Sequence, residues 1–238
     1  MIHATDSKGT FYILNKKDRT PIIFIHGVGL DHSIWDPQIN EFDNTVLIYD
    51  ILGHGKTPLN KNDLSFDDFS DQILNLMDEL KFNKVHLVGF SIGSLIARNF
   101  ATRFNDRLAS LTLLCSIFNR SDKEQKIVND RFEQTKKDHK LTKDALKRWF
   151  TEDYLNKNPG ISDKIFNILQ NNNMNNFIKI YSLFVKHKDN EKFENIKTKT
   201  LVITGEGDVG STPEMSINLG KKIKNSVVKI IPKGKHLC

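Results

Sequence analysis

The pentapeptide Gly89-Phe90-Ser91-Ile92-Gly93 is the feature that most restricts how this chain can fold. An apolar run at residues 84–90, typical of a buried strand, leads into it, and a helical pattern at 94–103 follows. A serine at such a sharp strand-to-helix turn takes unfavourable backbone angles, and its hydroxyl projects clear of the sheet. The flanking glycines remove side chains that would collide there. This context predicts that Ser91 is a nucleophile, with a plain surface turn as the alternative.

Short apolar runs rich in β-branched residues recur along the chain, each bounded by Gly, Pro or Asn. Runs of this length suit strands buried on both faces. Helical patterns separate several of them, and residues 65–80 show apolar side chains at helical spacing. We therefore predict an α/β fold with a mostly parallel central sheet and helices on both faces. The expected strands are residues 21–26, 45–50, 84–90, 108–115, 199–205 and 226–232.

The segment 119–196 breaks this alternation. It is polar and helical in period, and it is too long for a loop. We expect several helices inserted between two strands, covering one end of the sheet; this segment is called the cap below. The predicted division is a core made of residues 1–118 and 197–238, interrupted by the helical cap.

A serine nucleophile needs a base, and the base needs an acid that holds its tautomer. Among eight histidines, His236 follows a strand end and is the expected base. Asp208 follows the strand 199–205 and is the expected acid, with Glu206 as the alternative. His26 and His54 precede glycines, which indicates a role in shaping the backbone. His86 is expected in the core, and three histidines are expected to be exposed: His32, His139 and His187.

An oxyanion needs two backbone donors. The amide of Ile92 follows the nucleophile, and the amide of Val28 lies in the turn His26-Gly27-Val28-Gly29 at a strand end, so these two are the candidates. Several large apolar residues could line a substrate pocket beneath the cap, with packing inside the cap core as the alternative for each. They are Leu30, Trp35, Phe90, Phe118, Trp149 and Tyr181.

Taken together, these segments resemble the α/β-hydrolase superfamily. The matching pieces include the Gly-x-Ser-x-Gly turn, Gly205-Glu206-Gly207-Asp208 and Gly234-Lys235-His236, and the order Ser91, Asp208, His236 is that of the superfamily. The stretch from Leu30 to Gln38 and the surroundings of Trp149 are similar to 3-oxoadipate enol-lactonases and related esterases. The resemblance implies a helical cap insertion and a Ser-His-Asp triad.

The sequence departs from this superfamily after His236, where only Leu237 and Cys238 follow. Members usually continue into a final helix that packs on the sheet, and that helix is missing here. A histidine so close to a chain end is expected to fray unless packing holds it. We expect either a longer chain or another chain, such as a second copy in a homo-oligomer, to cover the sheet.

The composition narrows the function classes. The formal charge is +6, but lysines are dispersed among acidic residues, so nucleic acid is not an expected partner. No apolar run is long enough for a membrane span, and no signal peptide is recognisable. Cys115 and Cys238 have no metal-like spacing and fit a reducing compartment. We expect a cytoplasmic protein without a metal or cofactor.

These residues predict a serine hydrolase that cleaves a small carboxylic ester or lactone through an acyl-enzyme. Arg120 and Arg148 are candidates to contact an acidic lactone by their location in the chain alone. The alternatives are a carbon–carbon bond hydrolase or a perhydrolase on the same triad, and a non-catalytic binding member of the fold. A dehalogenase is disfavoured because those enzymes carry aspartate where Ser91 stands.

Overall fold

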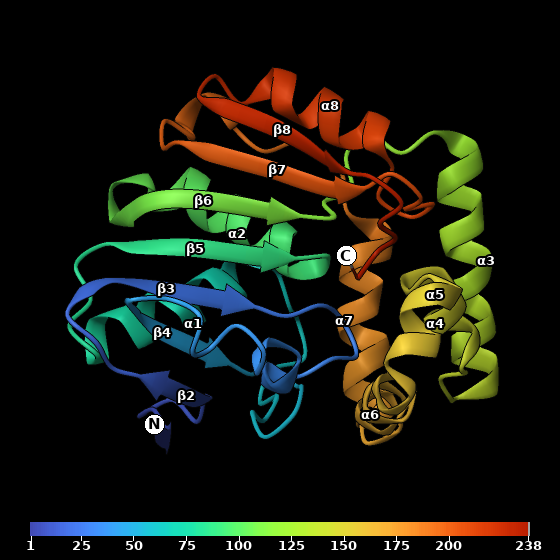
Figure 1. Ribbon diagram of the computed structural model, residues 1–238, viewed down its shortest axis with the longest axis horizontal. Coiled ribbons are helices and arrows are strands. Elements are labelled where there is room, and N and C mark those ends of the chain that lie inside the picture. Colours follow the sequence, from blue (N-terminus) through green and yellow to red (C-terminus); the bar gives the residue numbers. More distant parts are fainter. Residues whose placement is uncertain (238) are drawn as a thin grey trace.

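An eight-stranded, mostly parallel sheet forms the centre of the molecule in this computed structural model, which describes residues 1–237 (Figure 1). The strand order is β1-β2-β4-β3-β5-β6-β7-β8; β1 and β2 pair antiparallel, β2 pairs antiparallel with β4, and the pairs from β4 to β8 are parallel. The strands are β1 (Ile2–Thr5), β2 (Phe11–Asn15), β3 (Arg19–Ile25), β4 (Asn44–Tyr49), β5 (Val85–Phe90), β6 (Leu108–Leu114), β7 (Thr200–Gly205) and β8 (Ser226–Ile231).

All six strands expected from the sequence are present, with ends that differ by one or two residues. The hairpin of β1 and β2 was not predicted. Its first strand has only four residues, mostly exposed, so it offers little of the apolar periodicity by which strands are recognised. Cys238, one of the two cysteines in the sequence argument, lies outside the described residues.

Three helices pack on one face of the sheet: α1 (Phe66–Glu79), α2 (Ile92–Arg103) and α8 (Pro213–Lys222). Leu76, Phe100 and Leu219, one from each helix, belong to the same buried cluster as Leu87 and Val202 of the sheet. Burying these side chains supplies most of the driving force for this layer, at roughly 25 cal/mol per Å² of apolar surface.

The opposite face is covered differently. Over β3 and β4 it packs against a segment that contains the 3-10 helix η1 (His32–Trp35), through Trp35 and Ile39. Toward β8 this face is more open, and Val227 is 67% exposed. The sequence predicted helices on both faces of the sheet. The structure has α-helices on one face, and a 3-10 helix covers part of the other.

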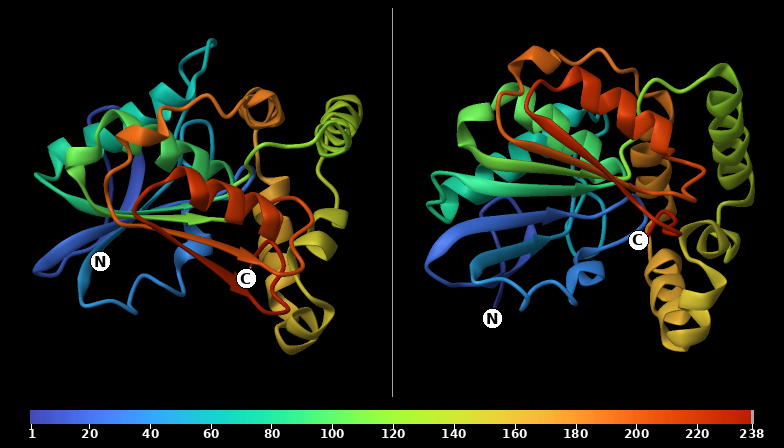
Figure 2. Two further views of the ribbon diagram at one scale, coloured as in Figure 1. Left: turned by 90° about the horizontal axis from the view of Figure 1, so that it is seen from above. Right: turned by 45° about the horizontal axis from the view of Figure 1, so that its top comes forward.

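Five α-helices lie between β6 and β7, beyond the carboxyl ends of the strands (Figures 1 and 2). Ser121 begins the first of them with a capping box that includes Glu124, and Asn173 caps the last by accepting from the Asn176 amide. The helices are α3 (Asp122–Asp138), α4 (Asp144–Trp149), α5 (Glu152–Lys157), α6 (Pro159–Gln170) and α7 (Met174–Lys186). Two short 3-10 helices, η2 (Asn105–Arg107) and η3 (Phe193–Asn195), precede β6 and β7.

Candidate active site

Ser91 lies at the turn between β5 and α2, with φ +56° and ψ −118°. A β-carbon on Gly93 would come within 2.6 Å of the Ile25 carbonyl oxygen, and one on Gly89 would collide with the Gly93 carbonyl. Only glycine fits at these two positions, because the helix starts so close to the strands. The strained serine backbone, which costs of order 1–3 kcal/mol, is held by this packing.

Ser91, His236 and Asp208 form a continuous chain of polar contacts. The Nε2 atom of His236 lies 3.2 Å from the Ser91 hydroxyl oxygen, and its Nδ1 atom lies 2.7 Å from Oδ2 of Asp208. Glu206, the alternative acid, is exposed, and it accepts a hydrogen bond from the Lys233 amide instead. The structure thus brings together the three residues that the sequence singled out, from the ends of β5, β7 and β8.

The Asp208 carboxylate is buried and well supplied with donors. Its Oδ1 atom accepts from the amides of Gly210 at 2.8 Å and Ser211 at 3.0 Å. Burial alone would raise the pKa of Asp208, but His236 and these two amides outweigh it and hold the pKa below its usual value. The carboxylate therefore stays ionised at neutral pH.

His236 is held by contacts on several sides, although it lies near the end of the sequence. The Cys115 thiol donates to its carbonyl oxygen at 3.1 Å, and the next amide, of Leu237, donates to the Trp149 carbonyl at 2.9 Å. The rings of Phe90 and Trp149 lie 5.0 and 6.3 Å from the imidazole. These contacts provide the packing without which the histidine was expected to fray.

The loop after β3 passes close to Ser91. A β-carbon on Gly27 would lie 3.4 Å from the Ser91 β-carbon, and Val28 lines the same cavity as Ser91. Ile92 is the first residue of α2, where backbone amides have no partner within the helix. Both amides expected to bind an oxyanion thus lie on segments that adjoin Ser91.

Two neutral histidines shape this loop, in the backbone role that the sequence indicated. Nε2 of His54 accepts a hydrogen bond from the Gly29 amide at 2.8 Å, and Nε2 of His26 accepts from the Ile51 amide at 3.1 Å. Burial lowers the pKa of His54 to about 3 and also lowers that of His26. Both rings therefore remain able to accept at neutral pH.

His32 was expected to be exposed, but the structure buries most of its side chain beside Asp50. Its Nδ1 atom lies 2.7 Å from Oδ1 of Asp50, and its side chain is 13% exposed. Burial alone would lower the pKa of His32, but the hydrogen bond to Asp50 outweighs it and raises the pKa. The sequence offered no signal for this pair, because the partners are 18 residues apart and meet only when the sheet forms.

A cavity of about 380 Å³ is lined by Ser91, Asp208 and His236 and by side chains of the cap. Trp149 and Tyr181, two of the six expected pocket residues, line it together with Ser91, Asp208 and His236. The other four are buried in the hydrophobic core instead: Leu30, Trp35 and Phe90 belong to one apolar cluster and Phe118 to another. The lining also includes residues that were not predicted to line the pocket, among them Arg131, Leu169, Phe177 and Val209.

Two groups of side chains in residues 1–237 have the composition of a metal site. Cys115, Asp208 and His236 form the first, but its imidazole and carboxylate already contact each other. His187, Asp189 and Glu191 form the second, and the guanidinium of Arg98 is paired with both of its carboxylates at 2.6 Å. In each group the ligand atoms are engaged with protein partners.

Comparison with known proteins decides the family. The model of the alpha/beta hydrolase fold matches residues 20–238. The chain belongs to that family. It is an enzyme, a hydrolase. None of the helices described in residues 1–237 has both the length and the hydrophobicity of a membrane span.

Individual members of the alpha/beta hydrolase family resemble this chain over most of its length. It is 28% identical to (E)-2-((N-methylformamido)methylene)succinate hydrolase of Acinetobacter baylyi, over 96% of this chain and 88% of that protein. It is 25% identical to 3-oxoadipate enol-lactonase 1 of the same organism, over 89% and 80% of the two chains. The enol-lactonase structure from Burkholderia xenovorans superposes with a TM-score of 0.84 at 24% identity, covering 99% and 93%. The resemblance to enol-lactonases stated from the sequence is confirmed.

Proposed function

We propose that this hydrolase cleaves a small carboxylic ester or lactone through Ser91, His236 and Asp208, with a covalent acyl-enzyme intermediate. The observation that carries the proposal is the uninterrupted contact from Asp208 through His236 to the Ser91 hydroxyl, at the wall of a cavity. The enol-lactonase among the similar proteins is consistent with this substrate class.

In the first step His236 takes the Ser91 proton through Nε2, and the serine oxygen attacks the carbonyl carbon of the substrate. The ionised Asp208 stabilises the imidazolium that forms and keeps the Nδ1 proton directed at itself. His236 then gives its proton to the leaving alkoxide or enolate oxygen as its bond to the carbonyl carbon breaks, and an acyl group remains on Ser91. An ester releases a separate alcohol at this step, whereas in an opened lactone the new hydroxyl or enol stays attached to the acyl chain. Water, activated by the same imidazole, attacks this ester and releases the acid and the free serine.

The negative charge of each tetrahedral intermediate needs donors that are already in position. In this proposal the amides of Val28 and Ile92 supply them. His54 fixes the backbone beside Val28 through the Gly29 amide, so the loop need not reorganise during the reaction. Removing one such donor typically slows an enzyme of this kind by about 10²–10³-fold.

The cavity volume of about 380 Å³ favours a small substrate, because it lies near the lower end of the roughly 300–1,000 Å³ of ligand pockets. The segment 119–196 acts as the cap of this proposed site, and residues 1–118 and 197–238 act as its core. A cytoplasmic location and a homo-oligomeric state remain predictions from the sequence.

The test is the variant Ser91→Ala. We expect it to abolish hydrolysis of p-nitrophenyl acetate and of a small lactone, with a loss of at least about 10³-fold in kcat, because no nucleophile remains. A fluorophosphonate probe should label the wild type and not the variant, as read by intact-protein mass spectrometry. Ser162→Ala, on the cap helix α6, is the matched control and should keep both properties.

Turnover by Ser91→Ala at the wild-type rate would overturn the proposal. A fluorophosphonate adduct on Ser91 without cleavage of any ester or lactone would instead favour a carbon–carbon bond hydrolase or a perhydrolase. A folded wild type that takes no label would favour a binding protein.

A further inference from the structure

Three arginines from different parts of the cap line the cavity that contains Ser91 and His236. Arg120 precedes α3, Arg131 lies within α3, and Arg148 lies in α4. All three are half-buried, and Tyr181 of α7 lines the same cavity. The nucleophile therefore belongs to the core side of the cavity, whereas these guanidinium groups belong to its cap side.

Within residues 1–237, none of these three arginines forms an ion pair with a carboxylate. Arg120 donates to the carbonyls of Phe184 and Val185 at 3.1 and 3.2 Å, and Arg148 donates to the Asp144 carbonyl at 3.2 Å. Arg131 lies near Tyr181, where burial raises the pKa of the phenol and the charge of Arg131 acts against that rise. Since a guanidinium carries five N–H donors, each arginine retains donors for a ligand.

The arginines are charged in a setting that penalises charge. Burial lowers the pKa of Arg120 to about 10 and also lowers that of Arg148, so both remain protonated at neutral pH. Burial raises the pKa of Tyr181, although the three neighbouring arginines act against it, so its hydroxyl keeps its proton. Partly buried cations without a counter-ion are unfavourable, and an anion placed among them would relieve that cost.

The acidic residues around the cavity do not supply this anion. Asp208 is engaged with His236, and Glu124 caps α3 by accepting from Ser121. Asp138 and Asp144 are exposed, and Asp138 accepts from Gln134. The positive charge around Tyr181 is therefore left for a ligand.

We propose that Arg120, Arg131 and Arg148, together with the Tyr181 hydroxyl, bind a carboxylate group of the substrate. The assignment rests on the proposed function and makes it narrower: the substrate is an ester or lactone whose acid group lies several bonds away from the scissile carbonyl. A planar guanidinium matches a carboxylate with two parallel hydrogen bonds, and the phenol adds a third donor.

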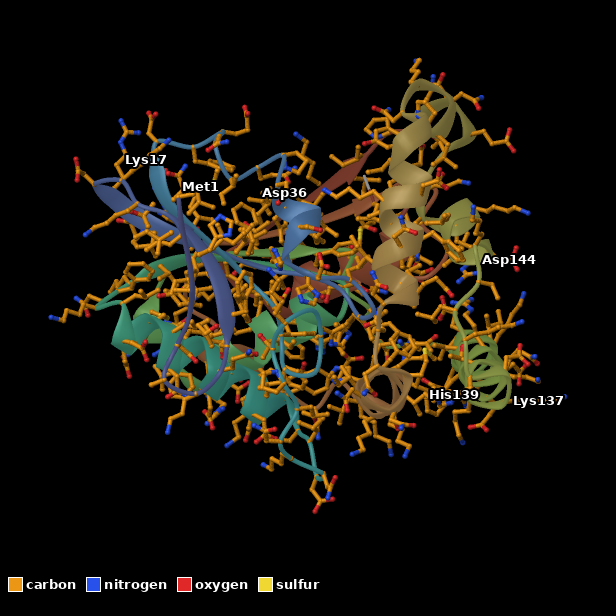
Figure 3. All side chains as sticks on the ribbon, turned by 90° about the horizontal axis from the view of Figure 1, so that it is seen from below. Met1, Lys17, Asp36, Lys137, His139 and Asp144 are labelled. Atoms are coloured by element: carbon orange, nitrogen blue, oxygen red, sulfur yellow. The ribbon has the colours of Figure 1, made fainter. Side chains whose placement is uncertain are left out.

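Two p-nitrophenyl esters of equal length test this subsite. One is the mono-p-nitrophenyl ester of adipic acid, which carries a free carboxylate, and the other is its methyl ester, which is neutral. We expect Arg131→Gln to raise KM for the anionic ester by about 10–100-fold and to leave kcat/KM for the neutral ester within about twofold. The matched control is Lys137→Gln, because Lys137 is on the same helix but extends to the outside of the molecule (Figure 3).

Calorimetry with adipate gives a readout that does not depend on turnover. Wild type and Lys137→Gln should bind adipate equally, and Arg131→Gln should bind it at least about tenfold more weakly. If the protein hydrolyses neither ester but Arg131→Gln still loses adipate binding, the subsite is supported and the proposed reaction is overturned. Hydrolysis of both esters with equal effects of Arg131→Gln, or tighter binding of inorganic phosphate than of adipate, would overturn the subsite alone.

Discussion

Asp208 and Glu206 differ by two positions in the sequence but have very different surroundings. Asp208 is 3% exposed and accepts from two amides and from His236. The exposed Glu206 instead accepts from the Lys233 amide at 2.9 Å, in the turn that leads to His236. One carboxylate can hold the imidazole tautomer, and the other can only stabilise the turn.

We therefore expect Asp208→Asn to lower kcat for p-nitrophenyl acetate by about 10²–10⁴-fold, because an amide can hold the imidazole in the wrong tautomer. Glu206→Gln should change kcat by less than about threefold, since its contact involves a backbone amide away from the triad. Steady-state kinetics on both variants, with circular dichroism to check folding, measures the difference. Equal losses in the two variants would contradict the assignment of Asp208 as the acid.

Single residues were predictable from the sequence where a local pattern determined their position. Ser91, Asp208 and His236 each follow a strand end, and the carboxyl ends of parallel strands meet at one edge of the sheet. His32 was misjudged because its partner Asp50 comes from a different strand end. His187, also expected to be exposed, is only 7% exposed, since it packs beside Asp189.

At the scale of elements, the segment after α7 is fastened to α2 by one buried arginine. Arg98 is fully buried, and its guanidinium pairs with Asp189 and Glu191 at 2.6 Å and donates to the Ile117 carbonyl at 2.8 Å. Asp189 also accepts from the Asn119 amide at 2.6 Å. Both ends of the cap, near residues 119 and 189, therefore meet at the same guanidinium.

Asp189→Asn should destabilise the protein by about 3 kcal/mol at pH 7, because it leaves a buried charge short of one partner. Burial would raise the pKa of Asp189, but His187 and Arg98 outweigh it and hold the pKa well below its usual range. A lowered folded-state pKa gives stability that is complete above the unfolded value of about 4 and is lost as pH falls toward the folded value. The deficit of the variant should therefore shrink below about pH 4.

Urea unfolding at pH 7 and pH 3 measures this dependence. The control is Asp163→Asn, which removes an ion pair between Asp163 and Lys143 that is 73% and 60% exposed. It should cost less than about 1 kcal/mol at either pH. A deficit for Asp189→Asn that is the same at both pH values would mean that its charge is not what stabilises the junction.

The elements themselves were predictable to different degrees. Strands in the middle of the sheet, such as β5 and β6, are mostly apolar and stand out in the sequence. The helix boundaries within the cap did not, because polar residues fill its surface and caps such as Ser121 and Asn173 resemble many other polar positions. Of the six expected pocket residues only Trp149 and Tyr181 line the cavity, since core and cavity both attract large apolar residues.

At the scale of the whole molecule, sheet and cap share their hydrophobic cores. Ile180 of α7 belongs to the cluster built on α1 and α2, and Phe150 and Leu169 of the cap belong to the cluster that contains Trp35. A third cluster joins α3 to α7, and Val28 of the loop after β3 packs against it. Because side chains of the cap also belong to the two clusters of the sheet, we do not expect the cap to fold alone.

The two tryptophans report on the two sides of this shared core. Trp149 lies at the end of α4 in the cap, and Trp35 packs against Phe24 of β3 at a ring distance of 4.8 Å. The variant Trp35→Phe keeps only the tryptophan of the cap. We expect its urea midpoint measured by fluorescence to agree within about 0.2 M with its midpoint measured by far-ultraviolet circular dichroism. Trp149→Phe, which leaves the reporter beside the sheet, should likewise give fluorescence and circular dichroism transitions that coincide.

A fluorescence transition of Trp149 at clearly lower urea than the loss of helix and sheet would instead show that the cap opens first. In that case binding of adipate at the cap arginines should raise the Trp149 midpoint selectively, whereas in a single cooperative unit it must raise every transition together.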